Sequence, residues 1–453
     1  MNPLSLLELE AHPDAPVIVT RRGTLTRGEA LAEAAQIAEE LGEVGAAGAP
    51  VVISLDSGTG FLASLVGAWL AGSTPVLLDP LVRRELDSAV GKIGARAVIR
   101  AQNAPADGVA ENVPIVSPRG ARSAPKGPPP SLPDGAPILH LYTSGSTGEP
   151  AIVSKTFEQL DVERRFLSGE LGTHLRAATL VPWCHIFGFN VAFLVPIRGG
   201  GVCDLTAGIS PKIVLDSAAA GLLDLVVVVP AILRVMVRML EESGAKALPA
   251  TCRFCTSGAA LPGDLRRRFR ELTGCAVMDI YGSTEAGGVA YRCDDGPWRV
   301  QPHVEWRVSP DGHLEVRSTS VSDTVAGPGE FYRIGDLVRP AGEGFVLEGR
   351  ADDIVKIGGR RVSLDEIRRA VEACPSVGAA AVAAEEVRGE MRLVAFVEAP
   401  RGGVTPEGVK AFVRTRLADH KVPRAVHVVP SLPLNPGGKV DRRKLLGELG
   451  EKG

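Results

Sequence analysis

The chain has 453 residues, of which 45% are hydrophobic and 23% are charged, as expected for a soluble, folded protein of two or three domains. The formal net charge of −3 gives no general electrostatic reason to expect binding to nucleic acid. Seven sparse cysteines argue against a disulfide framework, and no apolar run of about 18 residues predicts a membrane span. The first residues do not have the pattern of a signal peptide, so we expect a cytoplasmic protein.

The first third of the chain alternates helical and extended patterns. Residues 26–41 have helical spacing, with Thr26 as a plausible N-cap and Glu29 three residues later, as in a capping box. A second helix is predicted over residues 60–72, and short apolar runs predict strands at 51–55, 75–78 and 95–100. This alternation predicts a parallel α/β architecture. Residues 104–136 are rich in Pro, Gly and Ser and predict a linker or a surface loop.

The α/β pattern resumes at residues 138–142, continues to residues 225–229, and then gives way to short strands. Residues 306–318 read as a strand, a Pro-Asp-Gly turn and a second strand. Beyond residue 349 the chain carries more Lys and Arg than Asp and Glu, which fits a small basic lid over phosphates or an ordinary charged surface. Cys252 and Cys255 form a CxxC pair without a second pair at zinc spacing, so we expect a buried structural role.

The strongest local pattern is the segment YTSGSTGEP at residues 142–150, directly after an apolar strand. Glycines allow close approach of the backbone, and hydroxyl and amide groups donate to phosphate oxygens. The segment is not a Walker A loop, because no Gly-Lys-Ser/Thr closes it. It predicts a phosphate-binding loop, with a Ser/Gly-rich surface loop as the alternative. The predicted ligands are Thr143, Ser144, Gly145, Ser146, Thr147 and Gly148.

This segment resembles the phosphate-binding signature of the adenylate-forming (AMP-binding) superfamily, which includes acyl- and aryl-CoA synthetases, peptide-synthetase adenylation domains and firefly-type luciferases. Other segments resemble further family motifs and follow in the family's order: PWCHIFG (182–188), SGAAL (257–261), DIYGSTE (279–285), YRIGD (332–336), GRADDIVKIGGR (349–360) and NPGGKVDR (435–442). Several motifs in the right order make a chance resemblance very improbable.

The resemblance implies an ATP site around the DIYGSTE segment. Tyr281, next to Gly282, would stack on adenine, and Ser257 and Gly258 would pack against it. Thr284 would contact the α-phosphate. Glu285 would hold Mg²⁺, a hard cation that prefers carboxylate and phosphate oxygens.

Other roles are implied in the same way. His185 would gate the acid pocket, and Asp336 would accept both ribose hydroxyls, because a carboxylate can take two donors. Arg350 would contact ribose or phosphate, and Lys439 would reach the forming bond as the adenylation lysine. The segment with Lys356 would bind cofactor, with Gly358 and Gly359 leaving room for a pantetheine arm.

The sequence departs from the family pattern after the phosphate loop. The family commonly has Pro-Lys-Gly there, whereas Pro150 is followed by Ala151. The nearest lysine is Lys155, and the sequence leaves open whether Lys155 takes over the phosphate contact.

The resemblance implies an α/β protein with a large amino-terminal AMP-binding domain (residues 1–350), made of α/β subdomains and a distorted β-barrel. Residues 351–453 would form a small, mobile α+β lid. The implied enzyme is an acid–thiol ligase that converts an aryl or fatty acid to acyl-AMP with MgATP. It then transfers the acyl group to coenzyme A or, alternatively, to a phosphopantetheinyl carrier protein. A non-catalytic nucleotide-binding relative is the alternative of a different class. The residues suggested for the acyl pocket are Trp183, Phe187, Phe189 and Val228.

Overall fold

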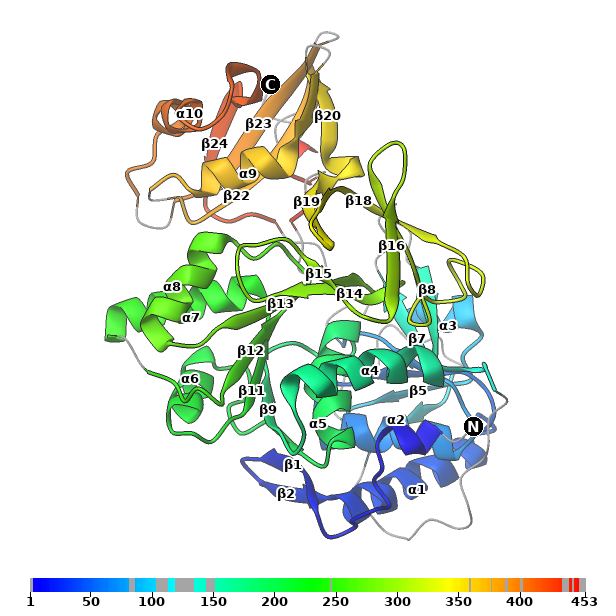
Figure 1. Ribbon diagram of the computed structural model, residues 1–453. Coiled ribbons are helices and arrows are strands. Elements are labelled where there is room, and N and C mark those ends of the chain that lie inside the picture. The colour runs from blue at the N-terminus through cyan, green and yellow to red at the C-terminus, as the bar shows by residue number, and fades with distance from the viewer. Residues whose placement is uncertain are drawn as a thin grey trace. The chain divides into compact units, whose positions relative to one another are not determined.

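The computed structural model describes residues 3–80, 86–102, 113–118, 134–143, 151–244, 247–357, 360–375, 377–387, 390–399, 402–433, 440–441 and 444–447. The chain forms two compact units, one of residues 1–305 and 316–332, the other of residues 306–315 and 333–453 (Figure 1). In the described ranges no helix has both the length and the apolar character needed to cross a membrane.

The first unit contains a six-stranded sheet in the order β6-β5-β3-β4-β7-β8. Its strands are β3 (Val51–Ser54), β4 (Pro75–Leu77), β5 (Ala97–Arg100), β6 (Ile115–Val116), β7 (Pro137–Thr143) and β8 (Ala151–Thr156). The strands are parallel except for β8, which pairs antiparallel with β7. The associated helices are α1 (Arg27–Glu43), α2 (Thr59–Leu70) and α3 (Leu86–Ile93). Val51 and Ile53 of β3 join the core that contains α1 and α2, whereas Val52 joins the cluster that contains α3. Both faces are therefore covered, which explains why β3 is continuously apolar.

A nine-stranded sheet has the order β15-β14-β13-β12-β11-β9-β10-β1-β2. Its strands are β1 (Pro16–Thr20), β2 (Gly23–Thr26), β9 (Arg176–Thr179), β10 (Val202–Asp204), β11 (Leu225–Val228), β12 (Arg253–Thr256), β13 (Val277–Ser283), β14 (Gly287–Arg292) and β15 (Arg299–Val300). Its helices are α4 (Phe157–Leu171), the π-helix Gly188–Leu194, α5 (Val195–Arg198), α6 (Pro211–Ala219), α7 (Pro230–Ser243) and α8 (Gly263–Thr273). Val227 of β11 packs into the large core and Val228 into the cluster formed with α6, α7 and α8. Alternate residues of β11 thus face the two sides of the sheet.

The second unit contains most of a four-stranded sheet, in the order β16-β17-β18-β19. These strands are β16 (Val304–Val308), β17 (His313–Ser318), β18 (Tyr332–Ala341) and β19 (Gly344–Arg350). After the 3-10 turn Ala351–Asp353 come the hairpin β20 (Ile354–Ile357) and β21 (Arg360–Ser363), α9 (Leu364–Glu372), β22 (Ala379–Val387), β23 (Glu390–Glu398), α10 (Pro406–Arg414) and β24 (Ala425–Val429). A three-stranded sheet, β22-β23-β24, packs with α9 and α10 around its own apolar cluster.

Several predicted elements are confirmed. Thr26 caps α1, and both hydrogen bonds of the predicted capping box with Glu29 are present. The predicted strands at 51–55, 75–78, 95–100, 138–142 and 225–229 correspond to β3, β4, β5, β7 and β11. Residues 306–318 form the predicted strand–turn–strand. Cys252 and Cys255 are buried free thiols, and burial raises the pKa of each to about 12, in agreement with a structural role.

Candidate active site

The DIYGSTE segment lies where β13 turns back into β14. The two strands are antiparallel, with Gly282 opposite Gly288 and Ser283 opposite Gly287. A Cβ atom on Gly282 would lie 2.1 Å from the carbonyl oxygen of Gly287, so the close approach of β14 requires glycine there. Thr284 and Glu285 are half-buried in the connecting turn, where Ser283 Oγ accepts a hydrogen bond from Ala286 N at 3.1 Å.

The residues predicted to pack against adenine are brought together by the neighbouring parallel strands β12 and β13. Ser257 directly follows β12, and its hydroxyl donates to the carbonyl oxygen of Ile280 at 2.7 Å. Gly258 has a φ of +83°, a conformation that favours glycine. Tyr281 is half-buried, and its ring centroid lies 5.5 Å from that of Trp298. The structure thus gathers Ser257, Gly258 and Tyr281 at one end of adjacent strands.

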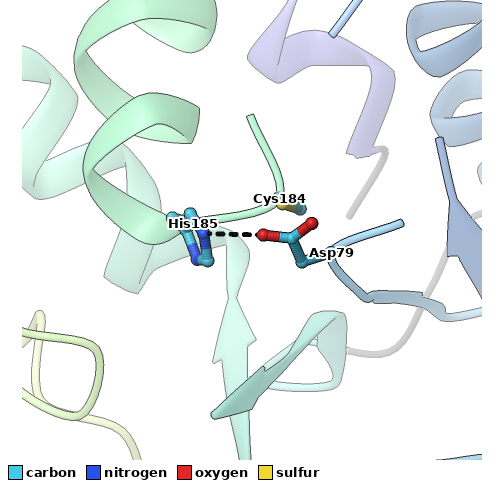
Figure 2. A group of neighbouring side chains, drawn as sticks. All are labelled: Asp79, Cys184 and His185. Carbon is cyan, nitrogen blue, oxygen red and sulfur yellow. Dashed lines mark ion pairs between the residues drawn. The ribbon is translucent and has the colours of Figure 1, made fainter. Parts of the chain in front are cut away.

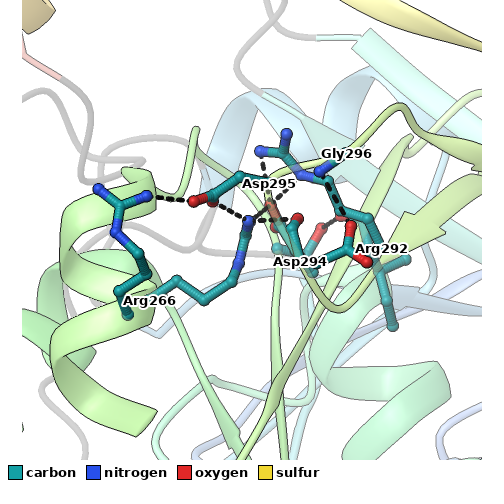
Figure 3. Close-up of polar contacts among 9 residues, drawn as sticks. Arg266, Arg292, Asp294, Asp295 and Gly296 are labelled. Carbon is teal, nitrogen blue, oxygen red and sulfur yellow. Dashed lines mark hydrogen bonds and ion pairs between the residues drawn. The ribbon is translucent and has the colours of Figure 1, made fainter. Parts of the chain in front are cut away.

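An ion network is centred on Asp279, two residues before Tyr281, and Figure 3 shows its arginines, Arg266 and Arg292. Asp279 Oδ2 is 3.0 Å from Arg266 Nη2 and 3.2 Å from Arg292 Nη2. Burial raises the pKa of Asp279 to about 6, although both guanidinium groups favour the carboxylate. The Arg292 guanidinium also lies 4.3 Å from the centre of the Trp298 ring, which packs on Tyr281. The sequence did not predict Arg266 and Arg292 as site residues. Hydrophobic periodicity does not reveal ion pairs between residues that only the folded sheet brings together.

The turn that carries Glu285 is anchored by Lys155, which is only 1% exposed on β8. Lys155 Nζ donates to the backbone carbonyl oxygens of Glu285, at 3.0 Å, and Ser320, at 2.7 Å. Burial lowers the pKa of Lys155 to about 8, opposed by the nearby carboxylates of Glu163, Glu285 and Asp323. The sequence makes Lys155 a candidate for a phosphate contact. In this structure its ammonium group instead donates hydrogen bonds to two backbone carbonyl oxygens.

Glu285 is chemically suited to hold Mg²⁺. Its backbone carbonyl accepts from Lys155 and Ser322, whereas within the described residues no hydrogen bond or ion pair engages its half-buried carboxylate. A carboxylate whose oxygens remain available is the kind of ligand that Mg²⁺ prefers, together with phosphate oxygens and water. The residue type and its environment therefore fit the predicted metal role.

Among the described residues, one other group has metal-ligand chemistry: Asp79, Cys184 and His185, whose donor atoms lie within 4.8 Å of one another (Figure 2). His185 Nε2 is 3.4 Å from Asp79 Oδ2, and His185 is 46% exposed. Burial raises the pKa of the Cys184 thiol well above its usual range. One carboxylate beside sulfur and imidazole does not suit Mg²⁺, so this group is a poorer magnesium site than Glu285.

His185 lies in the loop between β9 and the π-helix, and this loop is tightly folded. A Cβ atom on Gly188 would lie 2.2 Å from the carbonyl oxygen of Pro182. The suggested acyl-pocket residues belong to two different hydrophobic clusters. Trp183 and Phe189 are fully buried in the large core, while Val228 is fully buried in the cluster on the other side of β11. Phe187 is half-buried beside the large core.

Part of the predicted site lies outside the described residues. This applies to Ser144, Gly145, Ser146, Thr147, Gly148, Gly358, Gly359 and Lys439, and to the side chains of Thr143 and Lys356. The strands on either side of the predicted phosphate-binding loop are described: β7 and β8 pair from Pro137 with Thr156 to Thr143 with Ala151.

In the second unit, Asp336 and Arg350 face each other across the antiparallel strands β18 and β19. Arg350 Nη1 is 3.7 Å from Asp336 Oδ1, and the carboxylate is the more buried of the two groups. A Cβ atom on Gly335 would lie 3.2 Å from Arg350 Nη2, so a larger residue there would press on the guanidinium. Asp336 and Arg350, which come from separate motifs, thus form one ion pair.

Comparison with known proteins identifies the family. A family model described as "AMP-binding enzyme" matches residues 8–332, and a second, "AMP-binding enzyme C-terminal domain", matches residues 366–439. The chain belongs to the AMP-binding enzyme family. The resemblance to adenylate-forming enzymes seen in the sequence is therefore confirmed.

Individual relatives of this AMP-binding protein differ in length. An isonitrile lipopeptide synthase of Mycobacterium tuberculosis is 30% identical over 379 residues, and the match covers 74% of this chain but only 14% of that protein. The sulfoacetate–CoA ligase of Cupriavidus necator is 30% identical over 356 residues, covering 70% of this chain and 68% of the ligase.

Solved structures confirm the fold class. The o-succinylbenzoate CoA synthetase of Bacillus subtilis, solved with an acyl-adenylate intermediate, superimposes with a TM-score of 0.87 over 98% of both chains. At 21% sequence identity this likeness shows the fold. The predicted α/β architecture, with a large amino-terminal and a small carboxy-terminal domain, is the architecture of this AMP-binding protein.

Proposed function

We propose that this AMP-binding protein is an acid–thiol ligase, which converts a carboxylic acid to acyl-AMP and then to a thioester. The observation that carries the proposal is that Ser257, Tyr281 and Glu285 lie together where β12 ends and β13 turns into β14. The Glu285 carboxylate is available there to a cation. A scaffold protein would have no use for such a carboxylate beside a predicted nucleotide site.

The first step joins the acid to AMP. A carboxylate oxygen attacks the α-phosphorus of ATP, an O–P bond forms, and the bond to pyrophosphate breaks. Tyr281 packs against adenine, Thr284 donates to the α-phosphate, and the 143–148 segment donates to the outer phosphates. Glu285 would hold Mg²⁺, which would neutralise phosphate charge. Lys439 places a positive charge at the developing charge between carboxylate and phosphate.

The second step transfers the acyl group to sulfur. A thiolate attacks the acyl carbonyl carbon, and AMP leaves with the electron pair of the broken bond. Residues 351–453 are proposed to form a lid that turns between the two steps. Asp336 is proposed to bind ribose, Arg350 to contact ribose or phosphate, and Gly358 and Gly359 to lie beside the thiol's arm. His185 is proposed to gate the acid pocket. No side-chain nucleophile is needed, because positioning and electrostatic stabilisation supply most of the catalysis.

Coenzyme A is the proposed acceptor, supported by the name of the sulfoacetate–CoA ligase relative. A phosphopantetheinyl carrier protein is the second candidate acceptor. The acid is proposed to be aryl or fatty acyl.

The direct test incubates the protein with MgATP and a panel of acids, and measures pyrophosphate release and the mass of any acyl-AMP. Coenzyme A and a phosphopantetheinylated carrier protein are then supplied separately, and the thioester product is identified by mass. Glu285→Gln should abolish most Mg²⁺-dependent pyrophosphate release. Absence of acid-dependent release from the wild-type protein across the panel would contradict the proposal.

Lys439→Ala separates the two steps. Loss of one preorganised electrostatic contact should slow acyl-AMP formation roughly 100- to 1,000-fold. Supplied with synthetic acyl-AMP, the variant should form thioester at a near-normal rate. Equal loss in both steps, in a folded variant, would argue against the turning lid.

A further inference from the structure

The turn between β13 and β14 is held in place by groups from three other segments. Ser320 Oγ donates to Ala286 O at 2.9 Å, and Ser322 N donates to Glu285 O at 2.8 Å. The backbone amide of Gly288, the second residue of β14, donates to the buried carboxylate of Glu163 on α4. The backbone of the turn is therefore fixed from several sides, while the Glu285 carboxylate forms no hydrogen bond or ion pair within the described residues.

Lys155 is the one charged side chain in this set that reaches Glu285 directly. It comes from the edge strand of the six-stranded sheet, whereas β13 and β14 belong to the nine-stranded sheet. Its Nζ atom joins β8 to the Glu285 carbonyl and to the Ser320 carbonyl. Ser322 Oγ donates to Ser154 O at 2.6 Å, and this second bond fixes the residue next to Lys155 to the same segment.

From this geometry we infer that Lys155 is a positioning residue for Glu285, which sets where the metal-binding carboxylate lies, rather than a ligand of phosphate. Lys155 and Ser322 donate to the same carbonyl oxygen, so together they orient the Glu285 peptide and hence its Cα–Cβ bond. To reach a phosphate, Lys155 would have to leave both acceptors and withdraw from a site where it is 1% exposed. The inference rests on the proposed role of Glu285 in binding Mg²⁺.

The inference can be tested with a readout that does not depend on turnover. The melting temperature is measured with ATP over a range of Mg²⁺ concentrations, for the wild type, Lys155→Met and Glu285→Gln. Loss of a group that orients a metal ligand typically weakens metal binding roughly 10- to 100-fold. Lys155→Met should therefore raise by that factor the Mg²⁺ midpoint, which is the Mg²⁺ concentration that gives half of the maximal rise in melting temperature. Saturating Mg²⁺ should then restore the full response to ATP.

Controls make the result specific. Lys212→Met removes a lysine that is 74% exposed and paired with Asp216 on α6, and should leave the Mg²⁺ midpoint unchanged. The double variant Lys155→Met/Glu285→Gln should require no more Mg²⁺ than Glu285→Gln alone, because the lysine acts through the carboxylate. A weakened ATP response that saturating Mg²⁺ does not restore would instead make Lys155 a phosphate ligand. An unchanged Mg²⁺ midpoint in Lys155→Met would reduce the lysine to a structural role.

A test on the wild-type protein covers the case in which Lys155→Met does not fold. Reductive methylation of lysines is followed by mass mapping, with and without MgATP. Lys155 should stay unmodified in both conditions while Lys212 reacts. Modification of Lys155 in nucleotide-free protein, with protection by MgATP, would overturn the inference. Absence of acid-dependent pyrophosphate release with an intact Mg²⁺ response would remove the proposed enzyme activity and leave this inference standing.

Discussion

Two buried charges lie behind the candidate ATP site, and they are stabilised in different ways. Asp279, next to the Tyr281 strand end, is flanked by the guanidinium groups of Arg266 and Arg292. Lys155, beneath the Glu285 turn, donates to two backbone carbonyls and, in the described chain, forms no direct ion pair. The first arrangement depends on opposite charges, so that removing Asp279 takes the buried partner from both arginines. The second depends on peptide dipoles, which remain neutral when the lysine is replaced.

The largest expected effect comes from Asp279→Ala. The substitution removes the buried carboxylate that Arg266 and Arg292 share and leaves Arg266 with the partly exposed carboxylate of Asp295, and breaking a buried ion pair in this way costs about 3–5 kcal/mol of unfolding free energy. Urea unfolding followed by circular dichroism measures the loss. A loss below about 1 kcal/mol would mean that the existing bonds of Arg266 to the Asp294 carbonyl and the Asp295 carboxylate are sufficient to stabilise its charge.

Lys155→Met should cost less, about 1–3 kcal/mol, because two hydrogen bonds to neutral carbonyl oxygens are lost, and the nearby carboxylates of Glu163 and Asp323 are not directly paired with the lysine. The Glu285 carbonyl retains its hydrogen bond from Ser322 N, which limits the penalty. The same urea experiment compares the two variants side by side. If Lys155→Met were the more destabilising of the two, the contrast between the two buried charges would be wrong.

The pH dependence of stability sharpens the contrast further. The folded pKa of Lys155, about 8, lies below its usual value of 10.5, so between these values the unfolded chain binds more protons than the folded chain. The free energy of unfolding should therefore rise with pH across this range, with a limiting slope of about 1.4 kcal/mol per pH unit from this lysine. The difference in unfolding free energy between wild type and Lys155→Met, measured from pH 8 to 10.5, isolates this contribution. A difference that stays flat or falls with pH would contradict the assigned burial of the charge.

The smallest effect is expected for Lys212→Met on α6. This exposed lysine pairs with Asp216 at 2.7 Å, and such surface pairs contribute little because water screens them. The unfolding free energy should change by no more than about 0.5 kcal/mol. A loss as large as that of Lys155→Met would show that burial is not what separates the two lysines.

The sequence predicted those parts of the fold that depend on local chemistry. The capping box at Thr26 and Glu29 is complete within four residues, and the short apolar runs of β3, β4 and β11 are typical of strands covered on both faces. Strand order and the antiparallel placement of β8 have no local signature, because they depend on which distant segments share a core.

The site was predictable to a similar extent. The DIYGSTE motif placed Tyr281 and Glu285 in one short segment, whereas Arg266 and Arg292 reach Asp279 only through the folded sheet. Lys155 illustrates why the other contacts of the site could not be predicted from the sequence. A lysine beside a phosphate loop is expected to be exposed, since lysines are almost never fully buried, yet this one is turned into the protein. The acyl-pocket suggestion failed for the related reason that residue type does not reveal which face of β11 bears Val228.

The pairing of Asp336 with Arg350 constrains the length of the chain between them. Their alignment depends on the hairpin of β18 and β19 and on an irregularity in its register at Leu337 and Val338. Because strand side chains alternate with a period of two, one residue gained or lost at the Gly342 turn would carry Arg350 to the opposite face. Substitutions within the hairpin are thus more readily accommodated than insertions or deletions. Over evolutionary time the hairpin should accept amino-acid substitutions far more often than insertions or deletions, unless a second insertion or deletion restores the register.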